Sequence, residues 1–150
     1  MNETYYDVVI VGGGPGGLAA AQGAKEAGAA SVLVLEREDQ VGGILHQCIH
    51  DGFGLIRYRE TLTGPEYAHR AQGEALAAGA HLRTGALVTR LTPDRRPTAV
   101  PRPGLPHCQA GAVVPPTGCR QRTPAALAIP GTRTARVYTP GTAQHPVPTH

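Results

Sequence analysis

Apolar residues run without interruption over Val8–Val11 and are followed at once by glycines and an alanine-rich segment. Such a run predicts a buried strand, and Pro15 suits the first turn of a following helix, because its missing N–H has no partner there. We expect this helix to reach about Ala27, where Gly28 ends it. The apolar run Ser31–Leu35 predicts a second strand, so the chain opens with a β-α-β unit.

A second helix is predicted between Gly64 and Gly79. Thr63 or Gly64 caps its start, and Pro65 and Glu66 occupy its first turn. Further short strands are expected at residues 80–84, 86–92, 98–100 and 112–114. This order of elements predicts an α/β fold of the doubly wound, Rossmann-like kind, with a parallel sheet, helices and a small β excursion.

The glycines between the first strand and the first helix have the spacing of a dinucleotide-binding turn. They occupy positions 12, 14 and 17 in the pattern G-x-G-x-x-G, with a strand before them and a helix after. Gly12 allows a tight turn, Gly14 leaves room for a diphosphate, and Gly17 lets the helix pack closely on the sheet. The free N–H groups at the helix start attract a diphosphate without help from lysine or arginine.

An acidic residue, Glu36, closes the second strand. Its carboxylate can accept hydrogen bonds from both ribose hydroxyls of an adenosine and would repel a 2′-phosphate, so FAD or NAD is favoured over NADP. The neighbouring Arg37 either stacks on the adenine or is a solvated surface arginine. The alternative to this interpretation is a glycine-rich turn and a surface carboxylate without a ligand.

Charge and proline content divide the chain of 150 residues into two parts. Residues 1–92 hold 7 Lys and Arg against 10 Asp and Glu, whereas residues 93–150 hold 7 arginines against one acid. Twelve of the 14 prolines also follow residue 92, which gives that part little local support for helices or central strands. Its arginines are dispersed among prolines with a single aromatic residue, so nucleic-acid binding is not expected.

The sequence gives little indication of disulfide bonds, a metal site or a membrane span. Cys48, Cys108 and Cys119 are odd in number and widely spaced, which fits reduced thiols. The motif His46-x-Cys48-x-His50 brings only three metal donors together, so no metal site is predicted.

No stretch approaches the length of about 18 apolar residues that a membrane span needs, and the N-terminal apolar run is too short for a signal peptide. The sequence therefore predicts a soluble, cytoplasmic protein without a membrane partner.

Further motifs follow the glycine turn: Glu36-Arg37, Val41-Gly42-Gly43, Gly85–Val88, Thr117-Gly118 and Ile129-Pro130-Gly131. Their order resembles that of flavoproteins with two dinucleotide-binding domains, the group that includes the disulfide reductases. The stretches GGILHQCIHDGFG and LTGPEYAHR are most similar to FAD-dependent oxidoreductases related to the large subunits of opine oxidase, sarcosine oxidase and hydrogen cyanide synthase, and to glycerol-operon-associated flavoproteins. The resemblance implies an FAD-binding domain.

Carried over residue by residue, the resemblance implies that the glycine turn lines the FAD pyrophosphate and that Glu36 holds the adenosine ribose. Val88 either offers backbone atoms to adenine or is an ordinary strand residue. The expected cofactor-binding residues are Gly12, Gly14, Pro15, Gly16, Gly17, Glu36, Arg37, Gly42, Gly43, Val88, Thr117 and Gly118. No catalytic residue is assigned, because residues 46–50 form a loop that is either solvated or close to the flavin.

The chain departs from this family in two respects. Disulfide reductases carry C-x-x-x-x-C after the glycine pair, whereas Cys48 has Gly43 and Phe53 where a partner would stand, so dithiol relay chemistry is not expected. In addition, no second G-x-G-x-x-G follows. We therefore expect a partial FAD-binding domain over residues 1–132 and a poorly ordered tail over residues 133–150, in an N-terminal fragment or truncated gene product.

One leading hypothesis and two alternatives follow for function. The leading hypothesis is the FAD-binding portion of a flavin-dependent oxidoreductase, whose full-length form passes a hydride from an amine-like or related small substrate to flavin. NAD(P) and a hetero-oligomeric partner subunit are implied only for a full-length relative. The alternatives are a catalytically inactive remnant that binds an adenine dinucleotide, and an NAD-dependent dehydrogenase of the single-Rossmann type.

Overall fold

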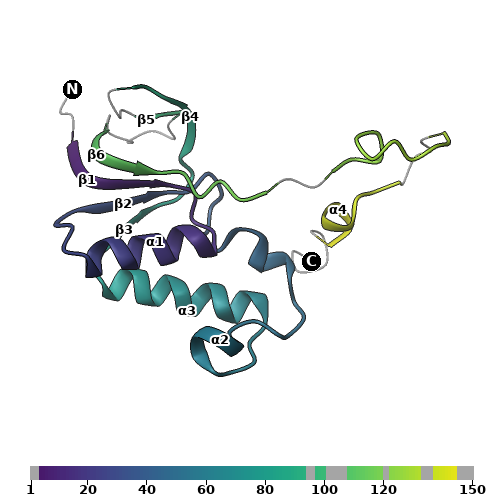
Figure 1. The fold of residues 1–150 in the computed structure, drawn as a ribbon, viewed down its shortest axis with the longest axis horizontal. Helices are drawn as coiled ribbons and strands as arrows, with labels where there is room; N and C mark the ends of the chain where they lie inside the picture. The colour runs from purple at the N-terminus through teal and green to yellow at the C-terminus, as the bar shows by residue number, and fades with distance from the viewer. Residues whose placement is uncertain (1–3, 94–96, 101–107, 120–121, 133–136, 145–150) are drawn as a thin grey trace.

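The computed structural model of this chain describes residues 4–93, 97–100, 108–119, 122–132 and 137–144. Its centre is a parallel four-stranded sheet in the order β3-β2-β1-β6 (Figure 1). The strands are β1 (Thr4–Val11), β2 (Val32–Leu35), β3 (His81–Arg83) and β6 (Cys108–Val114). Val8 of β1 pairs with Val32 in β2 and with Ala112 in β6, so β1 is hydrogen-bonded on both sides.

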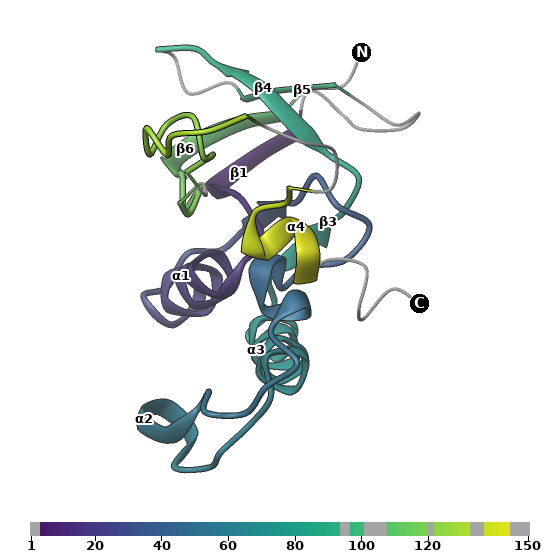
Figure 2. The same ribbon diagram turned by 90° about the vertical axis from the view of Figure 1, so that its right-hand side faces the viewer.

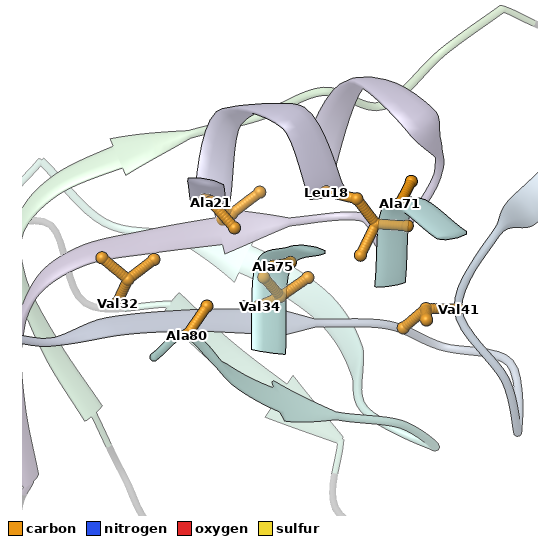
Figure 3. Packing of buried hydrophobic residues seen from close by; sticks show 9 residues of the cluster. Leu18, Ala21, Val32, Val34, Val41, Ala71, Ala75 and Ala80 are labelled. Atoms are coloured by element: carbon orange, nitrogen blue, oxygen red, sulfur yellow. The ribbon is translucent and has the colours of Figure 1, made fainter. Parts of the chain in front are cut away.

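Two helices cover one face of this sheet, as Figures 1 and 2 show from perpendicular directions. They are α1 (Pro15–Glu26) and α3 (Gly64–Ala77). Ala21 of α1 and Ala75 of α3 are fully buried in one apolar cluster with Val32 and Val34 of β2 (Figure 3). Small alanine side chains at these contacts let both helices approach the sheet closely.

The opposite face is covered by an antiparallel hairpin (Figure 2). Its strands are β4 (Leu87–Leu91) and β5 (Pro97–Val100). Val88 of β4 packs against a second apolar cluster that includes Val9, Leu33 and Ala110. The expected α/β fold with a parallel sheet and a small β excursion is therefore confirmed. In the described residues, however, both helices lie on one face, whereas a doubly wound core has helices on both.

Local signals set the ends of both helices. Thr63 caps α3, because its hydroxyl accepts the Glu66 N–H at 3.4 Å while the Glu66 carboxylate accepts the Thr63 N–H at 2.8 Å. Each helix is followed by a glycine in the left-handed region, Gly28 with φ of +95° and Gly79 with φ of +88°. The predicted boundaries of the two helices are thus confirmed to within a few residues.

The segment between β2 and α3 is more structured than the loop that the sequence predicts. It contains the 3₁₀ helix η1 (Gly43–Gln47) and the short helix α2 (Leu55–Tyr58), which projects away from the sheet (Figure 2). Arg57 donates to the Glu74 carboxylate of α3 at 2.7 Å, and the Tyr58 hydroxyl donates to the same carboxylate oxygen at 3.0 Å. A single helical turn has too little periodicity to be recognised in the sequence. The position of α2 is set by the hydrogen bonds of Arg57 and Tyr58 to Glu74.

Part of the C-terminal region lies outside the described residues. Of the expected tail, this applies to residues 133–136 and 145–150, whereas Pro140–Gln144 form the short helix α4. No helix in the described ranges is both long enough and apolar enough to span a membrane.

Candidate functional site

The glycine-rich turn lies between the carboxyl end of β1 and the start of α1. Gly12 adopts a φ of +126° and donates its N–H to the Leu35 carbonyl at 2.9 Å, which ties the turn to the end of β2. Gly14 precedes α1 in an extended conformation, and Pro15 and Gly16 form the first helical turn. That turn contains no acidic residue, so the helix itself does not neutralise the positive end of its dipole.

The turn is closely packed at one glycine and open at another. A Cβ at Gly17 would overlap the carbonyl oxygen of Gly12. A Cβ at Gly14, by contrast, would have no heavy atom within 4 Å. Helix packing therefore requires Gly17, as predicted, while Gly14 borders open space at the start of α1.

Glu36 is a buried acid beside this turn, with 6% of its surface exposed. Its Oε2 accepts the Gly13 N–H at 2.7 Å, and its Oε1 accepts the Glu38 N–H at 3.0 Å. Because each carboxylate oxygen has two lone pairs, these hydrogen bonds orient the group and leave it further acceptor capacity. The structure thus brings together the acid and the glycine turn that the sequence singles out.

Gly13 belongs to the site although the motif does not predict it, because G-x-G-x-x-G leaves its second position open. A Cβ at Gly13 would lie 2.8 Å from Val41 Cγ1 and 3.1 Å from Glu36 Oε2. A glycine is therefore needed for the N–H to reach the carboxylate without displacing these side chains. The three consecutive glycines in the sequence were the available signal.

A second pair of glycines, in the segment after β2, closes on the turn. Gly42 donates its N–H to the Gly13 carbonyl at 2.7 Å. A Cβ at Gly43 would lie 3.3 Å from the Cα of Gly14. Their φ angles of +122° and +56° lie in the region that favours glycine. The two glycine motifs, which are separate in the sequence, therefore form one backbone surface.

A third segment, which leads into β4, is hydrogen-bonded to the backbone of Glu36 and Glu38. Gly85 donates its N–H to the Glu38 carbonyl at 2.8 Å, and Ala86 donates to the Glu36 carbonyl at 2.7 Å. Val88, two residues further on, is half-buried against the apolar cluster under the hairpin. These hydrogen bonds place the predicted segment around Val88 next to the acid.

Arg37 and Thr117-Gly118 lie at the exposed edges of this region. Arg37 pairs with Glu38 at 3.1 Å, and both side chains are more than half exposed. Thr117 follows Pro116, whose carbonyl oxygen would lie 3.1 Å from a Cβ at Gly12. Strand β6 has ended before the two prolines, so they interrupt none of its hydrogen bonds.

The histidines after Gly43 have separate environments. His46 Nε2 is 2.6 Å from the Val41 carbonyl oxygen, whereas His50 is exposed and lies near Phe53, with ring centroids 5.2 Å apart. Among the described residues, no three His, Cys, Asp or Glu side chains are grouped in a way that would hold a metal ion. Cys48, Cys108 and Cys119 form no disulfide bond with one another.

Comparison with protein families gives one match that covers more than half of the chain. Residues 7–90 match the family described as FAD dependent oxidoreductase. The matched stretch includes the glycine turn, Glu36, Gly42-Gly43 and Val88, whereas Thr117-Gly118 lie beyond it.

Similar individual proteins cover the same region. Thioredoxin reductase of Ureaplasma parvum serovar 3 is 36% identical over 77 residues, which are 51% of this chain and 23% of the relative. The soluble pyridine nucleotide transhydrogenase of Photobacterium profundum is 49% identical over 49 residues, which are 33% of this chain and 10% of the relative. The chain thus spans less than a quarter of these curated relatives.

Among solved structures, thioredoxin reductase of Lactococcus lactis superposes with a TM-score of 0.65 and 25% identity. The superposition covers 79% of this chain and 37% of that protein. It shows a Rossmann-like α/β fold shared with part of a larger oxidoreductase.

Proposed function

We propose that this chain, which belongs to the FAD dependent oxidoreductase family, binds FAD at its glycine-rich turn. The observation that carries the proposal is the open space at Gly14 beside the buried carboxylate of Glu36, which accepts the Gly13 N–H at 2.7 Å. A diphosphate requires room and free backbone N–H groups, and a ribose requires an oriented acceptor. The glycine turn and the start of α1 supply the room and the N–H groups, and Glu36 supplies the oriented acceptor.

Each part of the cofactor has proposed partners in the chain. The pyrophosphate binds at the turn and the start of α1, where Gly12, Gly14, Pro15, Gly16 and Gly17 leave the backbone accessible. Glu36 holds the adenosine ribose. Adenine and the remaining dinucleotide are contacted by Arg37, Gly42, Gly43, Val88, Thr117 and Gly118.

The adenine assignment is supported by the backbone around Glu36. Ala86 donates its N–H to the Glu36 carbonyl at 2.7 Å, which holds the segment leading to Val88 beside the proposed ribose position. Exposed Arg37 is free of the core and can cover the adenine ring, since a guanidinium stacks on aromatic faces.

Bound FAD supplies the redox chemistry, namely acceptance of a hydride from a reduced substrate. The residues of this chain bind and orient the cofactor. By resemblance to opine oxidase, sarcosine oxidase and hydrogen cyanide synthase large subunits, we propose an amine-like or related small substrate for the full-length protein. NAD(P), a partner subunit and a cytoplasmic location are proposed for that full-length form only.

Disulfide reduction is not part of the proposal, although thioredoxin reductases are among the similar proteins. Cys48 has Gly43 and Phe53 at the positions where a second thiol would stand. Relay of electrons through a dithiol requires two neighbouring cysteines.

Calorimetric titration of the chain with FAD and with NAD tests the proposal. We expect FAD to bind more tightly than NAD. Glu36→Ala removes the acceptor for both ribose hydroxyls and is expected to weaken FAD binding by at least about tenfold, since tenfold corresponds to one hydrogen bond to a charged group. Gly14→Val places a branched side chain in the path of the pyrophosphate and is expected to weaken binding by at least about tenfold.

Gly73→Val is the matched control. A Cβ at Gly73 also has no heavy atom within 4 Å, but this glycine lies on the exposed surface of α3. FAD affinity should therefore be unchanged in this variant. Equal affinity for FAD and NAD, no binding of either, or an equal loss in Gly73→Val and Gly14→Val would count against the FAD assignment.

A further inference from the structure

The peptide unit that joins Val41 to Gly42 is held at both ends. Its carbonyl oxygen lies 2.6 Å from His46 Nε2, and its N–H donates to the Gly13 carbonyl at 2.7 Å. Val41 is 3% exposed, and Gly42 and Gly13 are buried, whereas His46 is half-buried. The hydrogen bond between Gly42 and Gly13 is therefore shielded from water, and that of His46 is partly shielded. The orientation of this one peptide plane is therefore set by an imidazole on one side and by the glycine turn on the other.

The Gly13 carbonyl extends this arrangement into the proposed pyrophosphate position. It belongs to the peptide unit that carries the Gly14 N–H, and no peptide bond in the described chain is cis. In a trans peptide the N–H points away from the C=O, so a fixed Gly13 carbonyl fixes the direction of the Gly14 N–H. The hydrogen bonds thus run in series from His46 through two peptide units, and such series strengthen one another.

The space at Gly42 matches the imidazole. A Cβ at Gly42 would lie 2.5 Å from His46 Nε2 and 2.8 Å from the Cβ of Ala68 in α3. The His46 ring therefore packs against the bare Cα of Gly42, beside α3. The glycine and the histidine are needed together, because a larger residue at position 42 would displace the ring from the Val41 carbonyl.

The protonation of the ring follows from its partner. A carbonyl oxygen only accepts hydrogen bonds, so Nε2 must carry the hydrogen. In neutral imidazole Nδ1 is then the unprotonated nitrogen. Since Nε2 donates its hydrogen to a backbone carbonyl, this atom has a structural role and does not react with a substrate.

We propose that His46 is a positioning residue of the dinucleotide site: its Nε2–H orients the Val41–Gly42 peptide, which orients the Gly13–Gly14 peptide toward the pyrophosphate. The proposal rests on the proposed FAD-binding function for its effect on affinity. The hydrogen-bond series itself is present in the protein without ligand. It can therefore be tested by NMR without FAD, independently of the affinity measurements.

The first test is ¹⁵N NMR of the histidine side chains in the full chain without ligand, with His46 assigned by comparison with the His46→Gln variant. We expect the Nε2–H tautomer for neutral His46, with a slowly exchanging Nε2 proton. An Nδ1–H tautomer, or rapid averaging between both forms, overturns the proposal. This measurement does not depend on whether the chain binds FAD.

The second test is calorimetric titration of FAD into three variants. His46→Phe keeps a ring but removes the donor, and we expect an affinity about tenfold lower than that of the unaltered chain. His46→Gln restores an N–H donor at a similar reach and is expected to recover affinity to within about threefold. His69→Phe, at an exposed histidine of α3, is the matched control and should leave affinity unchanged.

The outcomes separate positioning from mere packing. A His46→Phe variant that binds FAD like the unaltered chain overturns the proposal, as does a His46→Gln variant as weak as His46→Phe. Circular dichroism establishes that each variant is folded, and if His46→Phe is not, the tautomer measurement and His46→Gln decide. If the unaltered chain fails to bind FAD, the proposed function fails, while the NMR result still tests the role of His46.

Discussion

At the scale of the residue, the same added methyl group has opposite consequences at two glycines of α1. A Cβ at Gly17 would overlap the carbonyl oxygen of Gly12, so helix and turn would have to separate. Gly23 is exposed on the same helix, and a Cβ there would have no heavy atom within 4 Å. The fold therefore demands glycine at one position and merely tolerates it at the other.

We predict that Gly17→Ala lowers the free energy of unfolding by about 3 kcal/mol, the upper end of the range for overpacking. Gly23→Ala should raise it by about 0.5–1 kcal/mol, because alanine has the higher helix propensity. Urea unfolding followed by circular dichroism measures both. Similar changes in the two variants would contradict the packing seen at Gly17.

At the scale of the element, α2 is held by polar side chains instead of an apolar face. Arg57 bonds to Glu74 of α3 and to Gln22 of α1, and the Tyr58 hydroxyl donates to the same Glu74 oxygen at 3.0 Å. The Arg70 guanidinium lies 4.1 Å from the centroid of the Tyr58 ring. One helical turn with exposed apolar side chains is thus attached to α1 and α3 through Arg57 and Tyr58.

This attachment predicts a stability change at alkaline pH. Burial and the hydrogen bond to Glu74 raise the pKa of Tyr58 above its ordinary value of 10.0. Because the folded-state pKa is raised, the stabilisation is fully present below the unfolded pKa and is lost as pH rises through the folded pKa. We expect the free energy of unfolding to fall as pH increases above about 10, measured by urea unfolding at a series of pH values.

Tyr58→Phe should be less stable near neutral pH and show a smaller alkaline decline, because the titrating hydroxyl is gone. Tyr138→Phe, at a residue 63% exposed, is the control and should retain the full decline. An unchanged pH dependence in Tyr58→Phe would mean that Tyr58 does not carry the effect.

At the scale of the whole molecule, three segments that are distant in the sequence, residues 12–17, 36–43 and 85–88, meet in the proposed site. Gly13 connects to Glu36 and to Gly42 by hydrogen bonds of 2.7 Å, and Ala86 connects to Glu36 at 2.7 Å. In parallel α/β sheets, loops at the carboxyl ends of neighbouring strands meet in this way. A ligand that touches one segment is therefore expected to stabilise all of them.

We predict that FAD protects amides of residues 12–17, 36–43 and 85–88 from hydrogen exchange together, while α2 is unaffected. At a free concentration about 100 times Kd, a ligand that binds only the folded state adds about 2.7 kcal/mol to the free energy of unfolding. Exchange detected by mass spectrometry measures the pattern. Protection confined to residues 12–17, or spread equally over α2, would contradict a site built from these segments.

The sequence by itself determined the features that depend on neighbouring residues. The turn glycines, Pro15 at the start of α1, and Thr63 or Gly64 as the cap of α3 were predicted, because their geometry involves only a few consecutive residues. The structure identifies Thr63 as the cap through its reciprocal hydrogen bonds with Glu66. The apolar run Val8–Val11 in the second half of β1 was predicted, because the part of a strand that is covered on both faces has few polar positions.

Only the tertiary structure decided the features that depend on pairing between distant segments. Strand β6 begins at Cys108, earlier than the expected 112–114, because its register with β1 supplies hydrogen bonds that local composition does not reveal. The roles of Gly13 and His46 likewise exist only once Glu36 and Val41 have been brought beside them. The physical reason is that hydrogen-bond partners and packing space are set by folding, whereas propensity and capping are properties of the local chain.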